Sequence, residues 1–293
     1  RSIGVAVRAA PFFKQKPAVA GAWPGSTEGG TMAATYRALM LGDVIGTPGL
    51  ERLSADLPAL RKDTGADIVV ANGENASGGF GLCDESAKAL LGMGVDVISG
   101  GNHIWDKKGA DELLDSGLPI LRPVNYPAGA PGRGWIRLER GGASWLVINT
   151  QGRESMRPID CPFRAVDAAL AEVGPHSPPA MVLLDFHAES FQEKQAMAWY
   201  LDGRVGAVAG THTHVQTMDE RVLPKSTGYI GDLGMCGPPD SVIGVTPESC
   251  LRRNLTQMPI RMEPAQGRAM INGALFTFDD AGHCLEIRRI RVL

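Results

Sequence analysis

Residues that can bind metal ions recur where strand-like segments of this chain end, and no other feature constrains its fold as strongly. Short apolar runs, each typical of a buried β-strand, are followed at once by carboxylate, amide or imidazole side chains. Parallel strands share one edge of a sheet at their carboxyl ends, where ligands bind, so we expect these side chains to meet in one cleft. They are Asp43, Glu74, Asn75, Asn102, His103, His187, His212 and His214.

Helix-like segments separate most of these runs, and this alternation is typical of an α/β domain. We predict strands at residues 38–41, 68–71, 95–99, 181–186, 205–209, 269–278 and 285–292, and a hairpin across residues 135–149. We predict helices at residues 48–60, 84–93, 110–115, 163–173 and 192–201. No internal repeat or linker divides residues 37–293, so we expect a single α/β domain of two sheets covered by helices.

Residues 1–36 differ from the rest of the chain. Their first 31 positions carry four basic residues but only one acid, Glu28, with scattered proline and glycine and no clear period. We expect a disordered N-terminal extension or a non-native leader, with a transit peptide as the alternative. Met32 and Met40 are the candidate native starts.

Charge and composition exclude several classes of protein. The net charge of −3 does not indicate a whole-chain field for nucleic acid or membrane, although a local basic groove stays open. No apolar run approaches the roughly 18 residues that a membrane helix needs. The five cysteines are scattered and never form a C-x-x-C pair, so we expect neither a disulfide framework nor a thiolate zinc site. A cytoplasmic location is expected.

The ligand-type residues indicate a pair of metal ions. Carboxylate, amide oxygen and imidazole without thiolate suit Mn, Fe or Zn. About seven groups are more than one cation needs, so two metals that share a carboxylate are the economical arrangement. In an extended segment His212 and His214 would point the same way and could each bind one metal. Alone, each of these motifs would more often be a turn or a capping pair. The prediction of a metal site depends on their joint occurrence, one after another, at strand ends.

The same segments resemble the calcineurin-like metallophosphoesterase superfamily and, more narrowly, the YmdB family of cyclic-nucleotide phosphodiesterases. The resemblance covers roughly residues 37–293. Its motifs are LGDVIGTPG (41–49), ANGENASGGFGL (71–82), GGNHIWD (100–106), LLDFHAES (183–190), GTHTHVQTMDERVLP (210–224) and GDLGMCGPPDSVIG (231–244).

The resemblance implies a metallophosphoesterase-like two-sheet β-sandwich flanked by helices, in four layers ordered α/β/β/α. It implies that Glu74 bridges two divalent or trivalent metal ions, with Fe or Mn favoured and Zn as the alternative. It further implies that a hydroxide bridging the metals attacks phosphorus and that His103 protonates the leaving group. The substrate would be 2′,3′-cyclic AMP or a related cyclic nucleotide. One metal would take Asp43, Asn75 and His214, and the other would take Asn102, His187 and His212.

Two other classes of function compete with this hypothesis. The chain could be a regulatory protein that binds a partner or RNA and uses the metal site structurally. An α/β oxidoreductase is disfavoured because the G-x-G-x-x-G fingerprint is absent, and no cofactor-binding residues are expected. The expected partner is a small-molecule phosphodiester, with no membrane, and nucleic acid left open. Apolar stretches at residues 235–239 and 258–264 could contact a second copy in a homo-oligomer or could cover the core.

Overall fold

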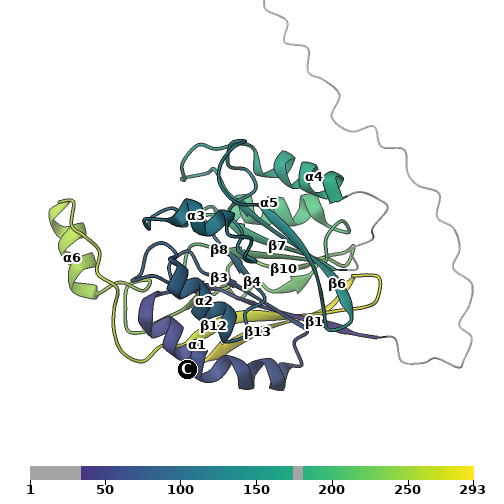
Figure 1. The fold of residues 1–293 in the computed structure, drawn as a ribbon, viewed down its shortest axis with the longest axis horizontal. Helices are drawn as coiled ribbons and strands as arrows, with labels where there is room; N and C mark the ends of the chain where they lie inside the picture. The colour runs from purple at the N-terminus through teal and green to yellow at the C-terminus, as the bar shows by residue number, and fades with distance from the viewer. Residues whose placement is uncertain (1–33, 174–180) are drawn as a thin grey trace, which may run out of the picture. The chain divides into compact units, whose positions relative to one another are not determined.

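Two β-sheets pack face to face, and helices cover their outer faces (Figure 1). The computed structural model describes residues 34–173 and 181–293; most of the predicted N-terminal extension, residues 1–33, lies outside them. Residues 34–293 make up one compact unit. No helix among the described residues is long and apolar enough to cross a membrane.

The first sheet has the strand order β13-β12-β1-β3-β4 within the described residues. Strands β1, β3 and β4 are parallel to one another, whereas β12 and β13 are antiparallel to their neighbours. The bounds are β1 Tyr36–Leu41, β3 Ile68–Asn72, β4 Val97–Ser99, β12 Ile271–Phe278 and β13 Cys284–Val292.

The second sheet has the order β5-β6-β7-β8-β10-β9, with β6, β7, β8 and β10 parallel. A separate two-stranded pair joins β2 to β11. The bounds are β5 Trp135–Arg140, β6 Ala143–Gln151, β7 Met181–His187, β8 Ala207–Thr211, β9 Arg221–Val222, β10 Gly228–Ile230, β2 Asp43–Val44 and β11 Met235–Cys236.

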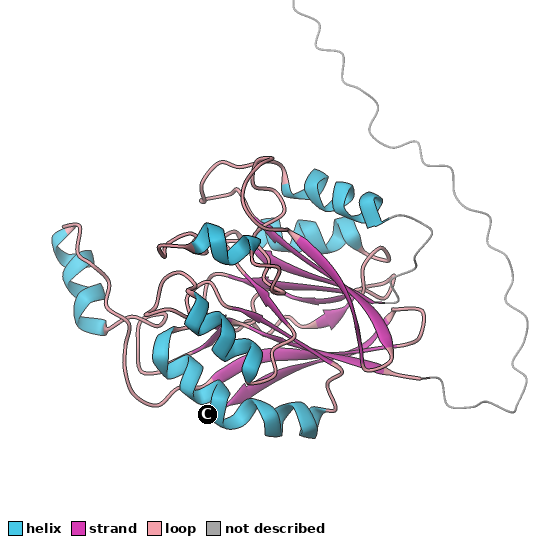
Figure 2. Ribbon diagram, viewed as in Figure 1, coloured by secondary structure: helices cyan, strands magenta, loops and turns pink. Residues whose placement is uncertain are grey.

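The helices lie on both outer sides of the paired sheets (Figure 2). Helices α1 and α2 pack on the first sheet, and α4 and α5 pack on the second. The predicted four-layer α/β/β/α architecture is therefore confirmed. The helix bounds are α1 Gly46–Thr64, α2 Asp84–Gly92, α3 Ala110–Asp115, α4 Pro162–Val173, α5 Phe191–Leu201 and α6 Pro247–Thr256.

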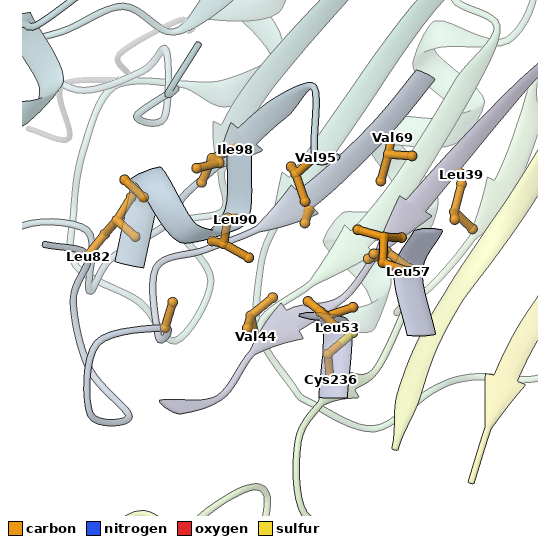
Figure 3. Packing of buried hydrophobic residues seen from close by; sticks show 14 of the residues in the cluster. Leu39, Val44, Leu53, Leu57, Val69, Leu82, Leu90, Val95, Ile98 and Cys236 are labelled. Carbon is orange, nitrogen blue, oxygen red and sulfur yellow. The ribbon is translucent and has the colours of Figure 1, made fainter. Parts of the chain in front are cut away.

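The apolar core is divided among the spaces between these layers. In β1 the side chains alternate: Leu39 and Leu41 face α1, and Ala38 and Met40 face the second sheet. In Figure 3, Leu53 and Leu57 of α1 lie against the same face of the first sheet as Leu39. Coverage on two sides explains why central strands such as β1, β3 and β7 are almost continuously apolar in sequence.

Helix α6 and the short strands β2, β9, β10 and β11 were not predicted. Helix α6 carries start signals, since Thr246 accepts a hydrogen bond from the Ser249 amide and Pro247 follows it. Its apolar residues Leu251 and Leu255 are exposed, however, so no buried face marks it in the sequence. Residues 235–236 are buried in β11, so this part of one apolar stretch covers the core, whereas Met258 in the other is exposed.

Candidate functional site

The predicted ligand-type residues converge at the carboxyl ends of the parallel strands of both sheets. Asp43 follows β1, Glu74 and Asn75 follow β3, and Asn102 follows β4. His187 is the last residue of β7, and His212 follows β8 directly. Asp43, Glu74 and His187 are fully buried. The structure thus brings together all seven residues that the sequence predicts as metal ligands.

The Nε2 atom of His187 is the meeting point of one half of this cluster. It lies 3.0 Å from Glu74 Oε1 and 3.1 Å from Asn102 Oδ1. It also lies 3.0 Å from Nδ1 of His212. Atoms of Glu74, His187 and His212 are close enough to one another to hold a single metal ion. A single ring nitrogen cannot donate a proton to Glu74, Asn102 and His212 at once. The lone pairs of these groups therefore converge on a position that suits a cation.

The other half of the cluster forms around Asp43. Its Oδ1 atom lies 3.5 Å from His214 Nε2 and 3.4 Å from Asn75 Nδ2. The Asn75 amide also lies 3.4 Å from Glu74 Oε1, so Glu74 belongs to both halves. This division matches the two ligand sets that the resemblance implies.

Hydrogen bonds behind the cluster fix the orientation of its imidazoles. The Nδ1 atom of His214 lies 2.7 Å from the carbonyl oxygen of Ile243, which can only accept, so Nδ1 carries the proton and Nε2 faces Asp43. The Thr211 hydroxyl donates to Asp185 at 2.7 Å, so it accepts from Nδ1 of His187 at 3.0 Å. Both rings therefore turn Nε2 toward the site, as metal-binding histidines do.

Electrostatics divide the cluster into charged and neutral groups. Burial opposes the charge of Asp43, but His214 beside it holds the pKa of that carboxyl well below its usual range. Burial lowers the pKa of His214, but the Asp43 carboxylate raises it to about 9. Burial and the neighbouring His187 lower the pKa of His212 to about 3. His212 is thus neutral near pH 7 and has a lone pair to offer a metal.

The backbone around His212 and His214 differs from the prediction. Both residues have positive φ, 100° and 63°, so the segment is not extended and its side chains do not alternate as in a strand. The two imidazoles reach their separate halves of the cluster through this bend. Non-glycine residues with positive φ persist only where surrounding contacts hold them.

A buried ion pair, which the sequence reasoning did not find, holds that bend in place. Asp232 Oδ2 accepts hydrogen bonds from the amide and the hydroxyl of Thr213, at 3.1 and 2.8 Å. Lys194 from α5 approaches the same oxygen at 2.7 Å, and both charged side chains are almost fully buried. The other oxygen accepts from the Gly234 amide at 2.8 Å, and the Gly234 carbonyl accepts from the Asp43 amide at 3.1 Å.

His103 lies beside the cluster rather than inside it. Its backbone amide donates to Glu74 Oε2 at 2.9 Å. Its Nδ1 atom donates to Asp106 Oδ2 at 2.7 Å, and about a third of its side chain is exposed. Asp106 was not singled out from the sequence, although its position three residues after His103 is a signal that could have found it. Nε2 is left as the nitrogen that can face a substrate.

An observation that is independent of the resemblance also indicates that these donor atoms would bind metal ions. The Asn75 amide oxygen is buried and has no hydrogen-bond partner among the described residues. An unpaired buried polar atom is unfavourable, and coordination to a cation would satisfy it. Two fully buried carboxylates, Asp43 and Glu74, also need compensating positive charge.

A cavity of about 300 Å³ adjoins the cluster. Glu74, Asn75, His103, His212 and His214 are among the residues that line it. This size lies at the lower end of the range for small-molecule sites, so a substrate there would contact both the cluster and His103.

Comparison with known proteins gives consistent matches over almost the whole body of the chain. A family model described as YmdB-like protein matches residues 39–290. The chain is 40% identical over 257 residues to the 2′,3′-cyclic-nucleotide 2′-phosphodiesterase of Bacillus subtilis (strain 168), an alignment that covers 87% of this chain and 97% of that protein.

Similar solved structures also match this chain over most of its length. A hypothetical protein from Thermus thermophilus is 45% identical with a TM-score of 0.82, over 87% of this chain and 98% of the other. A novel phosphatase from Mycoplasma pneumoniae is 31% identical with a TM-score of 0.83, over 89% and 94%. A 5′-nucleotidase precursor, also from Thermus thermophilus, is 12% identical with a TM-score of 0.58 over 89% of this chain and 54% of the other, and shares the fold alone.

Replacing Gly101 by alanine should prevent metal binding. A Cβ atom there would lie 2.2 Å from His187 Cδ2 and 2.5 Å from Glu74 Oε2, so the two side chains would have to separate. Gly92→Ala is the matched control, because a Cβ atom at the end of α2 meets nothing within 4 Å. Elemental analysis of the purified variants should find metal in Gly92→Ala and little in Gly101→Ala; equal metal content would contradict the proposed geometry.

Replacing Lys194 by methionine should destabilise the fold by about 3–5 kcal/mol, because Asp232 would be left buried and unpaired. The double variant Lys194→Met/Asp232→Asn should recover part of that loss, since the isolated charge is gone. Lys88→Met, which removes an exposed partner of Asp84, is the control and should change stability by at most about 1 kcal/mol. Urea unfolding measures all three; similar losses for Lys194→Met and Lys88→Met would show that the buried pair has no special role.

Proposed function

This chain belongs to the YmdB-like protein family, and from that premise we propose that it hydrolyses 2′,3′-cyclic nucleotides at the bond to the 2′ oxygen. It is a metal-dependent phosphodiesterase or phosphatase, a hydrolase of ester bonds. The observation that carries the proposal is the buried acid–imidazole cluster with His103 beside it at the edge of one cavity.

The residues in the cluster would hold two metal ions in the two sets described above. Asp43, Asn75 and His214 would bind one ion, Asn102, His187 and His212 the other, and Glu74 both. Iron or manganese is the proposed metal, with zinc as the alternative, because the donors are carboxylate, amide and imidazole. When bound, such a metal pair lowers the pKa of a water molecule and neutralises charge on the phosphoryl oxygens.

His103 would donate the proton that the leaving 2′ oxygen requires. The Asp106 carboxylate accepts from Nδ1 and thereby fixes the orientation of the ring, so that Nε2 is the nitrogen from which a proton can be transferred. The amide of the same residue donates to Glu74, so the proton donor and the cluster are held at a fixed separation. A water oxygen bonds to phosphorus as the bond between phosphorus and the 2′ oxygen breaks. The 2′ oxygen takes the proton from Nε2, and the product is a 3′-phosphate.

The alternative, a regulatory binding protein with a structural metal site, uses the cluster but not His103. A structural metal does not need an imidazole at the edge of a cavity. For location, we keep the cytoplasm as the proposal, because all five cysteines fall within the described residues and are free thiols, which suits a reducing compartment.

His103→Ala should lower kcat for 2′,3′-cyclic AMP by about 10²–10⁴-fold while metal content stays unchanged. The same variant should retain much more of its activity toward bis(p-nitrophenyl) phosphate, because nitrophenolate leaves without a proton. His283→Ala, which changes an exposed histidine far along the chain from the site, is the control. An equal loss of kcat for the two substrates, or no loss for either, would refute the role of His103 as proton donor. Partner binding that survives His103→Ala with full biological effect would favour the regulatory alternative.

Glu74→Gln should abolish turnover while the fold remains intact, because the amide has the same shape but no charge to share between two cations. Metal content and thermal unfolding are measured together with hydrolysis of 2′,3′-cyclic AMP. Glu51→Gln on the exposed face of α1 is the matched control. Full activity of metal-loaded Glu74→Gln would rule out its bridging role.

A further inference from the structure

The cavity beside the cluster also has an apolar part of its lining, which none of the assignments above uses. Besides these polar residues it is lined by the apolar side chains of Phe80, Ile243, Val245 and Met262. The charge of a phosphodiester lies on its phosphoryl oxygens, so apolar lining this close to the cluster points to contact with a less polar part of the substrate.

The apolar lining of the cavity comes from two segments that lie far apart in the sequence. Phe80 belongs to the loop after β3, and the other residues belong to an arm, residues 243–264, that carries α6 outward from the body (Figure 1). The base of the arm is fixed by hydrogen bonds from Thr246 N to Glu263 O at 2.8 Å and from Ala265 N to Gly244 O at 2.9 Å. A Cβ atom at Gly79 would lie 2.4 Å from the Pro264 ring, so the loop and the arm are in direct contact.

Ile243 adopts a backbone conformation that a β-branched residue rarely tolerates. Its φ is +50°, and its side chain is half exposed. The carbonyl of this residue accepts the Nδ1 proton of His214 at 2.7 Å. Strain of this kind persists where function requires a geometry, and here it combines an imidazole contact with an apolar side chain on the cavity.

The chemistry of the leaving group decides what lies on the apolar side. The 2′ oxygen stays attached to its nucleoside after the bond to phosphorus breaks, so the nucleoside must lie on the side of the proton donor. Phe80 stands next to that donor: its ring and the His103 ring meet edge to face, with centroids 5.2 Å apart. An aromatic side chain at this position can stack on a base, and stacking does not depend on which base it is.

We propose that Phe80, Ile243 and Met262 form the nucleobase subsite of this enzyme, an inference that rests on the proposed function. The base stacks on Phe80 and contacts Met262 and Ile243, while the phosphate reaches the cluster. These side chains offer no hydrogen-bonding group, so the subsite recognises the aromatic face of the base rather than its edges. The stacking contact itself does not distinguish one base from another, and the base contributes mainly to binding.

Two substrates separate the subsite from the reaction centre. 2′,3′-Cyclic AMP carries a base, and glycerol 1,2-cyclic phosphate has the same five-membered cyclic phosphate without one. Met262→Ala should raise KM for 2′,3′-cyclic AMP by at least roughly fourfold, the effect of about one lost methylene contact, and should leave kcat/KM for the glycerol ester within about twofold. Met258→Ala is the matched control, because Met258 lies on the same arm, is exposed and does not line the cavity.

Phe80→Leu is the second variant, since it keeps the apolar volume near His103 but removes the stacking face. It should raise KM for the nucleotide and leave the glycerol ester unchanged. Equal effects on both substrates, or unchanged KM for the nucleotide in both variants, would overturn the subsite and leave the proposed function standing. Failure of the metal-loaded wild-type enzyme to hydrolyse either diester would overturn the proposed function and the subsite with it.

Discussion

Two fully buried carboxylates, Asp43 and Glu74, impose the constraint around which the rest of this structure is arranged. Negative charge removed from water is unfavourable unless positive charge or hydrogen-bond donors compensate it. The protein supplies part of that compensation with His214, His187 and the backbone amide of His103. Metal ions would supply the remainder, and the unpaired amide oxygen of Asn75 indicates the same need. The site is thus held ready for cations by groups that are poorly satisfied without them.

Support for the cluster comes from both sheets at once. Ser99 at the end of β4 and Thr211 at the end of β8 donate to Asp185 on β7, which ties the two sheets together directly behind His187. Burial raises the pKa of Asp185 to about 6 despite these donors. On the other flank, the Lys194–Asp232 pair fixes the bend that carries His212 and His214. Residues of the cluster can be held in position to about 0.5 Å because most of them stand at or next to strand ends rather than on free loops.

One residue connects the reaction centre to the apolar side of the cavity. Ile243 orients His214 through its carbonyl and lines the cavity with its side chain. The arm to which it belongs also contributes Met262 and carries α6. A substrate that moves this arm would therefore alter the orientation of a cluster imidazole. Helix α6 has little buried surface of its own, so its position depends on the hydrogen bonds at the base of the arm.

From the amino-acid sequence we could predict the α/β alternation, most strands and helices to within two residues, and the set of residues that would meet. Apolar periodicity is a local property, and the common edge of parallel strands follows from the topology. The separate role of His103 as proton donor was implied only by the resemblance of its motif to the family, and it stays a prediction. Tertiary structure alone decided the positive φ of His212 and His214, the Lys194–Asp232 pair and the course of the arm with α6. These features depend on contacts between residues that are distant in sequence. A buried charge is paired, and a strained backbone is held in place, only after the two sheets have packed together.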